Sequence, residues 1–105
     1  MQILLNSDNH ITGTLGLTER VESELHGALN RFSDWLTRVE VHIKDVNSIK
    51  GGNDDIACTI EARPRGHQPI VVTERGPNVA LALSSAADTM QAALERAFGK
   101  LEDRR

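Results

Sequence analysis

Few side chains of the types that perform catalysis or bind a metal are placed to act together in this sequence, and they do not make a complete set. Asp8, His10 and His42 would approach one another if the first two strands of a sheet are neighbours. A metal or catalytic centre needs several groups in matched geometry, and two histidines with one aspartate at polar positions arise readily by chance. The sequence therefore predicts a protein that is not an enzyme, with no cofactor and no small-molecule substrate.

Two other features that could support chemistry have simpler explanations. Gly51 and Gly52 are adjacent, but neither a helix nor a Lys-Ser or Lys-Thr pair follows them, as a phosphate-binding loop requires. Cys58 occupies an apolar position of its predicted strand, which indicates a buried and unreactive thiol rather than a nucleophile. Because it is the one cysteine of the chain, an internal disulfide is excluded.

Basic side chains are the remaining candidates for a binding surface. Arg63, Arg65 and Arg75 lie close together in residues 56–77, where the net charge is +1, whereas the whole chain carries −3. Lysine and arginine contact nucleic-acid phosphates, so the distribution of charge matters more than its sum. The candidates for phosphate or ribose contacts lie on one sheet face, in the turn that follows it and toward the end of the last helix: Arg38, Lys44, Arg63, Arg65, Arg75, Arg96 and Lys100.

The same side chains have an ordinary alternative explanation. Glu40, Glu61 and Glu74 weaken the positive field of the proposed face. A solvated sheet face with cross-strand ion pairs, such as Glu61 with Arg75 or Lys44, would give the same pattern. Basic residues near the end of the last helix also complement the helix dipole. Composition alone therefore does not decide between a binding surface and a solvated one.

The aromatic residues do not suggest base stacking. Phe32, Trp35 and Phe98 fall on or beside apolar stripes that belong to a core, and the sequence has no tyrosine. Proteins that hold single-stranded bases use aromatic side chains as stacking platforms. A nucleic acid bound here would therefore be recognised through its shape and its backbone.

Hydrophobic periodicity predicts the elements that position these residues. Apolar side chains recur every three or four residues from Leu17 to Leu36 and from Val79 to Leu101, as in amphipathic helices. Short apolar or alternating segments predict four strands. Apolar and polar residues alternate in the second and third of them. These strands span residues 2–6, 38–44, 56–63 and 70–73, with a long loop at 47–55 and a tight turn at 64–67.

The predicted element order is β-α-β-β-β-α, which belongs to the α+β class. A helix that joins the first two strands makes them parallel neighbours, and the later strands follow as antiparallel hairpins. Both helices then cover one face of a four-stranded sheet, and the other face is left to solvent or to a partner. A chain of 105 residues with 39% hydrophobic content is expected to form a single domain over residues 1–105.

The sequence indicates a cytoplasmic protein that does not act on membranes. Residues 1–6 have neither the basic start nor the apolar run of a signal peptide. No apolar segment approaches the roughly 20 residues that cross a bilayer, and no terminal lipidation motif is present.

Several local strings occur in a specific order along nearly the full chain. They are Asp8-Asn9-His10, Arg31-Phe32-Ser33-Asp34, Arg38-Val39-Glu40-Val41-His42, Gly51-Gly52-Asn53-Asp54, Cys58-Thr59-Ile60-Glu61-Ala62-Arg63, Gln68-Pro69-Ile70-Val71-Val72-Thr73, Ala86-Ala87-Asp88 and Leu94-Glu95-Arg96. In this order, and with the element order above, the sequence resembles the ribosome hibernation-promoting factors, also called ribosomal subunit interface proteins. None of these strings is a catalytic signature.

The resemblance implies a fold like that of double-stranded-RNA-binding domains and a partner, the small ribosomal subunit, contacted through 16S rRNA and ribosomal proteins. The protein would occupy the channel between head and body where mRNA and tRNA bind, and so inhibit translation under stress by steric occupancy. The chain ends at Arg105 without the further domain that long members use to pair ribosomes, so it resembles the short members.

A second function stays open beside this one. In similar proteins the last helix is heavily basic, whereas residues 78–105 here carry four acidic and four basic side chains. The chain could therefore be a regulatory protein-interaction module of the same fold that has lost strong RNA binding. The oligomeric state is also open, since the first or fourth strand offers an exposed edge for pairing.

Overall fold

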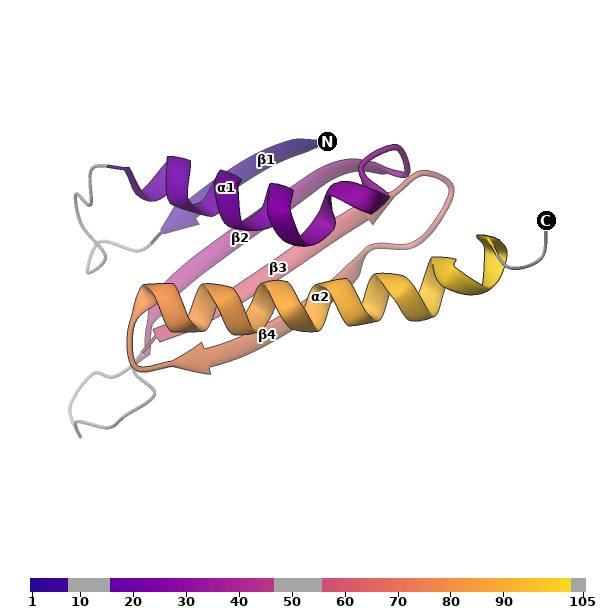
Figure 1. Cartoon of the computed structure of the whole chain (residues 1–105). Coiled ribbons are helices and arrows are strands. Elements are labelled where there is room, and N and C mark those ends of the chain that lie inside the picture. Colours follow the sequence, from indigo (N-terminus) through magenta and orange to yellow (C-terminus); the bar gives the residue numbers. More distant parts are fainter. Residues whose placement is uncertain (8–15, 47–55, 103–105) are drawn as a thin grey trace.

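The chain folds in the predicted order, β-α-β-β-β-α (Figure 1). The computed structural model describes residues 1–7, 16–46 and 56–102, with side chains as far as Phe98. The long loop predicted at 47–55 lies outside the described residues. The elements are β1 (Gln2–Ser7), α1 (Leu17–Leu29), a short 3-10 helix (Asn30–Phe32), β2 (Leu36–Asp45), β3 (Ile56–Pro64), β4 (Ile70–Gly76) and α2 (Val79–Glu102).

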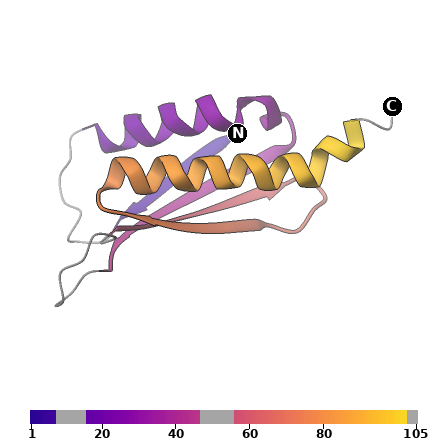
Figure 2. The same ribbon diagram turned by 60° about the horizontal axis from the view of Figure 1, so that its bottom comes forward.

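The four strands form one sheet in the order β1-β2-β3-β4. β1 and β2 are parallel because α1 carries the chain back between them, and the other two pairs are antiparallel. Figures 1 and 2 show both helices on the same face of this sheet. The predicted α+β fold class, pairing and layering are therefore confirmed. Among the described residues, no helix has the apolar length needed to cross a membrane.

The core fills the layer between the sheet and the two helices. Alternate positions of β2 and β3 face this layer. A fully buried valine, leucine or isoleucine side chain contributes roughly 1.5–3 kcal/mol relative to an exposed one. Small residues on α2 allow the helix to lie close to the strands. The buried residues include Val39, Val41, Ile43, Cys58, Ile60 and Ala62 of the sheet, Val21, Leu25 and Leu29 of α1, and Leu83, Ala86, Ala87, Met90 and Leu94 of α2.

The prediction was wrong about the end of the first helical stripe. Leu36 was expected to continue that stripe, but α1 ends at Leu29 and Leu36 is the first residue of β2. The pairing of β2 with β3 shifts register between Leu36 and Arg38, as in a β-bulge. This shift turns Leu36 into the core, where it is 2% exposed, although simple alternation from Arg38 would place it on the opposite face.

The corner between β4 and α2 is tightly packed. A Cβ atom at Gly76 would lie 2.7 Å from the backbone nitrogen of Ala82 and 3.0 Å from its Cα. The side chain of Asn78 caps the helix at this corner, because its Oδ1 accepts a hydrogen bond of 2.9 Å from the Leu81 amide. Gly76 therefore allows α2 to start directly against the end of β4.

We predict that Gly76→Ala destabilises the protein by about 1–3 kcal/mol, because the added methyl group would overlap backbone atoms that cannot rotate away. Gly27→Ala is the matched control. Gly27 lies in α1 and has open space around its Cβ position, so the same change should stabilise the protein by about 1 kcal/mol or less. Urea unfolding measures both values, and equal effects of the two changes would contradict the packing described for the corner.

We also predict that the Cys58 thiol is unreactive until the protein unfolds. Its side chain is fully buried, and desolvation raises the pKa of the thiol from 9.0 to about 12. Iodoacetamide at pH 8 should therefore modify Cys58 at a rate that follows the unfolded fraction as urea is added. Since the unfolded thiol ionises near its ordinary pKa while the folded one keeps its proton, this group should lower the free energy of unfolding as pH rises from 9 toward 12. Rapid modification of the folded protein would contradict both statements.

Candidate nucleic-acid interface

The sheet face opposite the helices, here called the open face, carries its side chains in rows. Each row contains the residues that pair across neighbouring strands and so point to the same side. The strand register gives Gln2, Arg38 and Arg63 in the row nearest the β3–β4 turn, then Leu4, Glu40, Glu61 and Val71, then Asn6, His42, Thr59 and Thr73, and finally Lys44, Ala57 and Arg75.

The first two rows contain arginines whose charges are compensated. We call the four residues Arg38, Glu40, Glu61 and Arg63 the arginine end. Arg38 Nη2 lies 3.0 Å from Glu40 Oε1, and Arg63 Nη2 lies 3.3 Å from Glu61 Oε2. The arginine side chains are 36% and 42% exposed, and their Nε atoms are buried without a hydrogen-bond partner among the described atoms. The two guanidinium groups therefore lie along the sheet and are already engaged by carboxylates.

These ion pairs differ from the expected ones. In the alternative explanation of a solvated face, Glu61 would pair across strands with Arg75 or Lys44. In the structure its cross-strand neighbours are Glu40 and Val71, and its ion pair runs along its own strand to Arg63. The two glutamates face each other, and so do the two arginines. The repulsion between these like charges is offset by the ion pairs along each strand.

The last two rows have a different character. We call Asn6, His42, Lys44, Ala57, Thr59, Thr73 and Arg75 the lysine end. Lys44 and Arg75 are exposed, and neither forms an ion pair with another described residue. Both pair in register with Ala57, so their Cα atoms lie about 10 Å apart, two strand spacings. The short Ala57 side chain leaves the space between the two cations open.

Neutral polar groups stand beside these cations. Thr59 Oγ1 and Thr73 Oγ1 share a hydrogen bond of 2.9 Å. His42 Nε2 lies 3.4 Å from Glu40 Oε2, so the imidazole connects the lysine end to the arginine end. The lysine end therefore combines two cations that have no ion pair among the described residues with a row of groups that can donate and accept hydrogen bonds.

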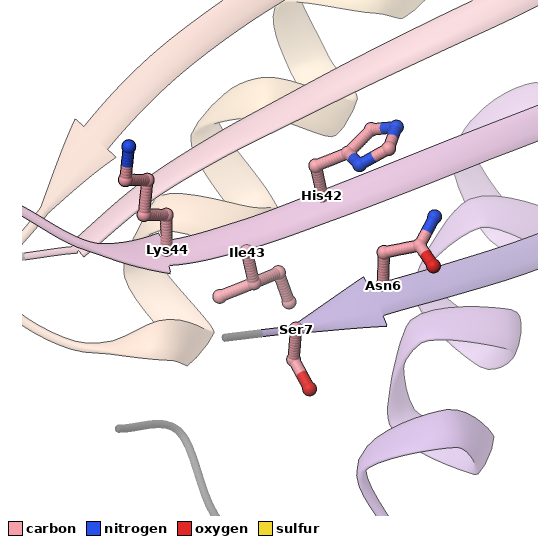
Figure 3. A pocket seen from close by; sticks show the side chains of 5 residues that line it. All are labelled: Asn6, Ser7, His42, Ile43 and Lys44. Atoms are coloured by element: carbon pink, nitrogen blue, oxygen red, sulfur yellow. The ribbon is translucent and has the colours of Figure 1, made fainter. Parts of the chain in front are cut away.

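A hollow of about 230 Å³ opens where the parallel strands β1 and β2 end. It is lined by Asn6, Ser7, His42, Ile43 and Lys44. Figure 3 shows the side chains of Asn6, His42 and Lys44 on one side of the two strands, with those of Ser7 and Ile43 on the other. Three of the five lining residues, Asn6, His42 and Lys44, thus belong to the lysine end.

Glu74 does not weaken the field of the open face, contrary to expectation. Its carboxylate lies on the helix side of β4, where Thr89 Oγ1 of α2 donates a hydrogen bond of 3.1 Å to Glu74 Oε2. The described rows of the open face hold four basic and two acidic side chains, a net charge of +2. By contrast, α1 carries three acidic side chains and one arginine. The charge of the molecule is therefore polarised, although its sum is negative.

The structure separates the predicted RNA contacts into groups. Arg38 and Arg63 are neighbours at one end of the open face, and Lys44 and Arg75 flank Ala57 at the other. Arg65 is exposed in the turn after β3, and its backbone amide donates to the Trp35 carbonyl at 2.8 Å.

The last two predicted contacts belong to the helical layer rather than to the sheet. Arg96 is exposed on α2, which covers the opposite face of the sheet (Figure 2). Lys100 also lies in α2, beyond the described side chains. The seven residues do not form one continuous patch on the open face, and the role of each in RNA binding stays a prediction.

The aromatic residues lie in the core or at its border, as predicted. Phe32 and Phe98 are buried and Trp35 is half-buried between them, with ring centroids 6.1 and 5.0 Å from that of Trp35. The rows of the open face contain no aromatic ring other than the imidazole of His42. This part of the surface therefore has no aromatic stack for bases.

The candidate metal ligands Asp8 and His10 lie outside the described residues. His42, the third member of that set, has Asn6 as its register partner on β1 and Thr59 on β3. Within the described part of the chain, no three histidine, cysteine, aspartate or glutamate side chains come together as a metal site would require.

Comparison with known proteins identifies the family. The family described as Sigma 54 modulation protein / S30EA ribosomal protein matches residues 6–103, nearly the whole chain. The chain belongs to this family. The resemblance to the ribosome hibernation factors is thereby confirmed. The comparison with curated proteins found no match.

Two solved structures share the fold of this S30EA family member. The N-terminal domain of Protein Y from Thermus thermophilus has a TM-score of 0.71 and 19% identity, over 91% of this chain and 98% of that one. A ribosomal subunit interface protein from Coxiella burnetii has a TM-score of 0.62 and 16% identity, over 98% of this chain and 99% of that one. At such identities the likeness concerns the fold alone.

Sequence reasoning missed four members of the lysine end. Asn6, Thr59 and Thr73 are ordinary polar strand residues, and Ala57 has no functional group at all. Their importance comes from register, which brings them into line with His42, Lys44 and Arg75. The alternation of β2 and β3 indicated which residues share a face, but it did not indicate which of them stand opposite one another.

We predict that Glu40→Gln/Glu61→Gln strengthens binding to a polyanion. Removing both carboxylates leaves Arg38 and Arg63 uncompensated, so the variant should elute from heparin at a higher salt concentration than the unchanged protein. The control Glu22→Gln/Asp88→Asn makes the same change in net charge on the exposed helical layer and should shift elution less. Equal shifts would mean that total charge, rather than the ion pairs of the arginine end, sets the affinity.

Proposed function

We propose that this protein binds the small ribosomal subunit and inhibits translation by occupying the channel between head and body where mRNA and tRNA bind. The observation that carries the proposal is the family match over residues 6–103, whose description includes a ribosomal protein. One of the solved structures with this fold is named a ribosomal subunit interface protein. The proposed mode of action is steric and requires neither a cofactor nor a catalytic group. Binding to ribosomes would take place in the cytoplasm.

The charge distribution supports a contact with rRNA through the open face. A net charge of −3 gives the whole molecule no long-range attraction to RNA, and charges beyond about 8–10 Å are screened at physiological salt. Local cations therefore have to supply the phosphate contacts. The open face carries +2 while α1 carries an acidic excess, so approach with the sheet toward RNA is favoured over approach with α1.

The proposal predicts co-sedimentation with 30S subunits at low salt and release as salt is raised. For three or four phosphate contacts, the slope of log affinity against log salt should be on the order of −2 to −4. Prior loading of the 30S subunit with mRNA and initiator tRNA should reduce binding, because both would occupy the same channel. The 50S subunit is the control particle.

Two results would count against this function. Absence of 30S association at low salt would reject ribosome binding, and recovery of a specific protein partner after nuclease treatment would then favour the protein-interaction module. Binding to loaded and empty 30S subunits with equal affinity would instead reject the channel as the site while keeping the subunit as the partner.

A further inference from the structure

We propose that the lysine end of the open face binds a ribose–phosphate unit of a single RNA strand, with the phosphate between Lys44 and Arg75 and the sugar beside the row of neutral polar groups. This inference rests on the proposed function and adds to it the group that is recognised and the part of the sheet that recognises it. The observations that carry it are the register of the strands, the ion pairs of the open face and the hollow at the end of β1 and β2.

The phosphate position follows from the two unpaired cations. Lys44 and Arg75 flank Ala57 at a Cα separation of about 10 Å, and both side chains are long enough to converge on a group above the short alanine. A phosphate oxyanion accepts charge-assisted hydrogen bonds from both an ammonium and a guanidinium group. Neither side chain is engaged with a described carboxylate, so within the described part of the chain no ion pair has to break before the anion binds.

The arginine end is less suited to this role. Arg38 and Arg63 are each held by a carboxylate on their own strand, and the Nε atoms are covered. A phosphate approaching this end would meet Glu40 and Glu61 beside the guanidinium groups. The cost of separating the ion pairs and the repulsion from two carboxylates both favour the lysine end.

The neutral row beside the cations has the chemistry to bind a sugar hydroxyl. The hydroxyls of Thr59 and Thr73 use one hydrogen between them, so the pair retains one O–H donor and free lone pairs. Asn6 presents an amide that can donate and accept, on the same side of the sheet as His42 and Lys44 (Figure 3). The 2′-hydroxyl of ribose is both a donor and an acceptor, and deoxyribose lacks it. This row therefore favours RNA over DNA.

The size of the hollow favours part of a strand over a whole small molecule. Pockets that enclose small ligands measure roughly 300–1,000 Å³. The hollow between Asn6, His42 and Lys44 has about 230 Å³, and its lining includes no aromatic ring for a base other than the imidazole. The hollow adjoins Lys44 but not Arg75, Thr59 or Thr73, so it can take only a neighbouring sugar of the strand, while the phosphate lies above Ala57.

The test compares two labelled oligonucleotides that differ only at the 2′ position, twelve uridines and twelve deoxyuridines, by fluorescence anisotropy at low salt. The unchanged protein should bind the RNA at least about threefold more tightly than the DNA, through the added hydroxyl contacts. Thr59→Val/Thr73→Val removes both hydroxyls and keeps the side-chain shape, and it should abolish this preference. Equal affinities in the unchanged protein, or a preference that survives in this variant, would overturn the assignment of the sugar.

The phosphate position is tested with charge variants in the same assay. Lys44→Gln/Arg75→Gln should weaken RNA binding by about tenfold or more and flatten its salt dependence. Arg20→Gln/Arg96→Gln removes two exposed cations from the helical layer and is the matched control. An equal loss in both variants would overturn the placement at the lysine end. Circular dichroism and the urea midpoint establish that each variant is folded.

Two further experiments are needed. One distinguishes an RNA strand from a free nucleotide as the ligand, and the other separates this inference from the proposed function. Uridine monophosphate should displace the RNA only at millimolar concentration, and displacement at micromolar concentration would assign the site to a free nucleotide instead. The last experiment is 30S co-sedimentation of the unchanged protein and of the Lys44→Gln/Arg75→Gln variant. If both bind equally well, this inference is overturned and the proposed function stays intact. Failure of the unchanged protein to bind 30S rejects the proposed function, while the oligonucleotide assay still decides the lysine end.

Discussion

The structure depends on one constraint: a sheet covered by helices on a single face must alternate its residues, and the pairing register then decides which of the outward residues become neighbours. Val39, Val41 and Ile43 of β2 lie beneath the helices with Cys58, Ile60 and Ala62 of β3. A slip of one residue would move this whole set into water, so the hydrophobic core fixes the register firmly. The arrangement of charges on the open face is therefore a consequence of packing on the other face.

That arrangement explains how an acidic protein can have a positively charged sheet face. Register places Glu40 opposite Glu61 and Arg38 opposite Arg63, which concentrates the compensated charges at one end of the sheet. At the other end, Lys44 and Arg75 stand on either side of Ala57, away from the acidic row. Screening limits electrostatic effects to roughly 8–10 Å, so a ligand at the lysine end responds to these two cations more than to the net charge of −3.

The sequence predicted what local periodicity controls and failed where tertiary pairing decides. The element order, the sheet pairing and the common face of both helices followed from alternation in Arg38–Lys44 and from helical stripes. Leu36 was misplaced because a bulge, which depends on the partner strand, interrupts alternation. The side of β4 that holds Glu74 was predicted wrongly, because Glu74 accepts a hydrogen bond from Thr89 of α2. The cross-strand pairs suggested for Glu61 do not form, because its ion pair runs to Arg63 on its own strand. For the candidate site, the sequence identified the cations, but Asn6, Thr59 and Thr73 join the lysine end only through register.

The proposed steric inhibition would make modest demands on such a surface. A protein that acts by filling a channel has to bind with the right orientation and to leave when translation resumes, so a few phosphate contacts are more suitable than a fully basic face. The arginine end fits this requirement, because its ion pairs already compensate two strongly basic side chains. Affinity would then come from the small number of cations that remain free, and its dependence on salt would make the complex easy to reverse. On this view the low charge of the last helix is compatible with ribosome binding, since the orientation of the sheet rather than the total charge determines which contacts form.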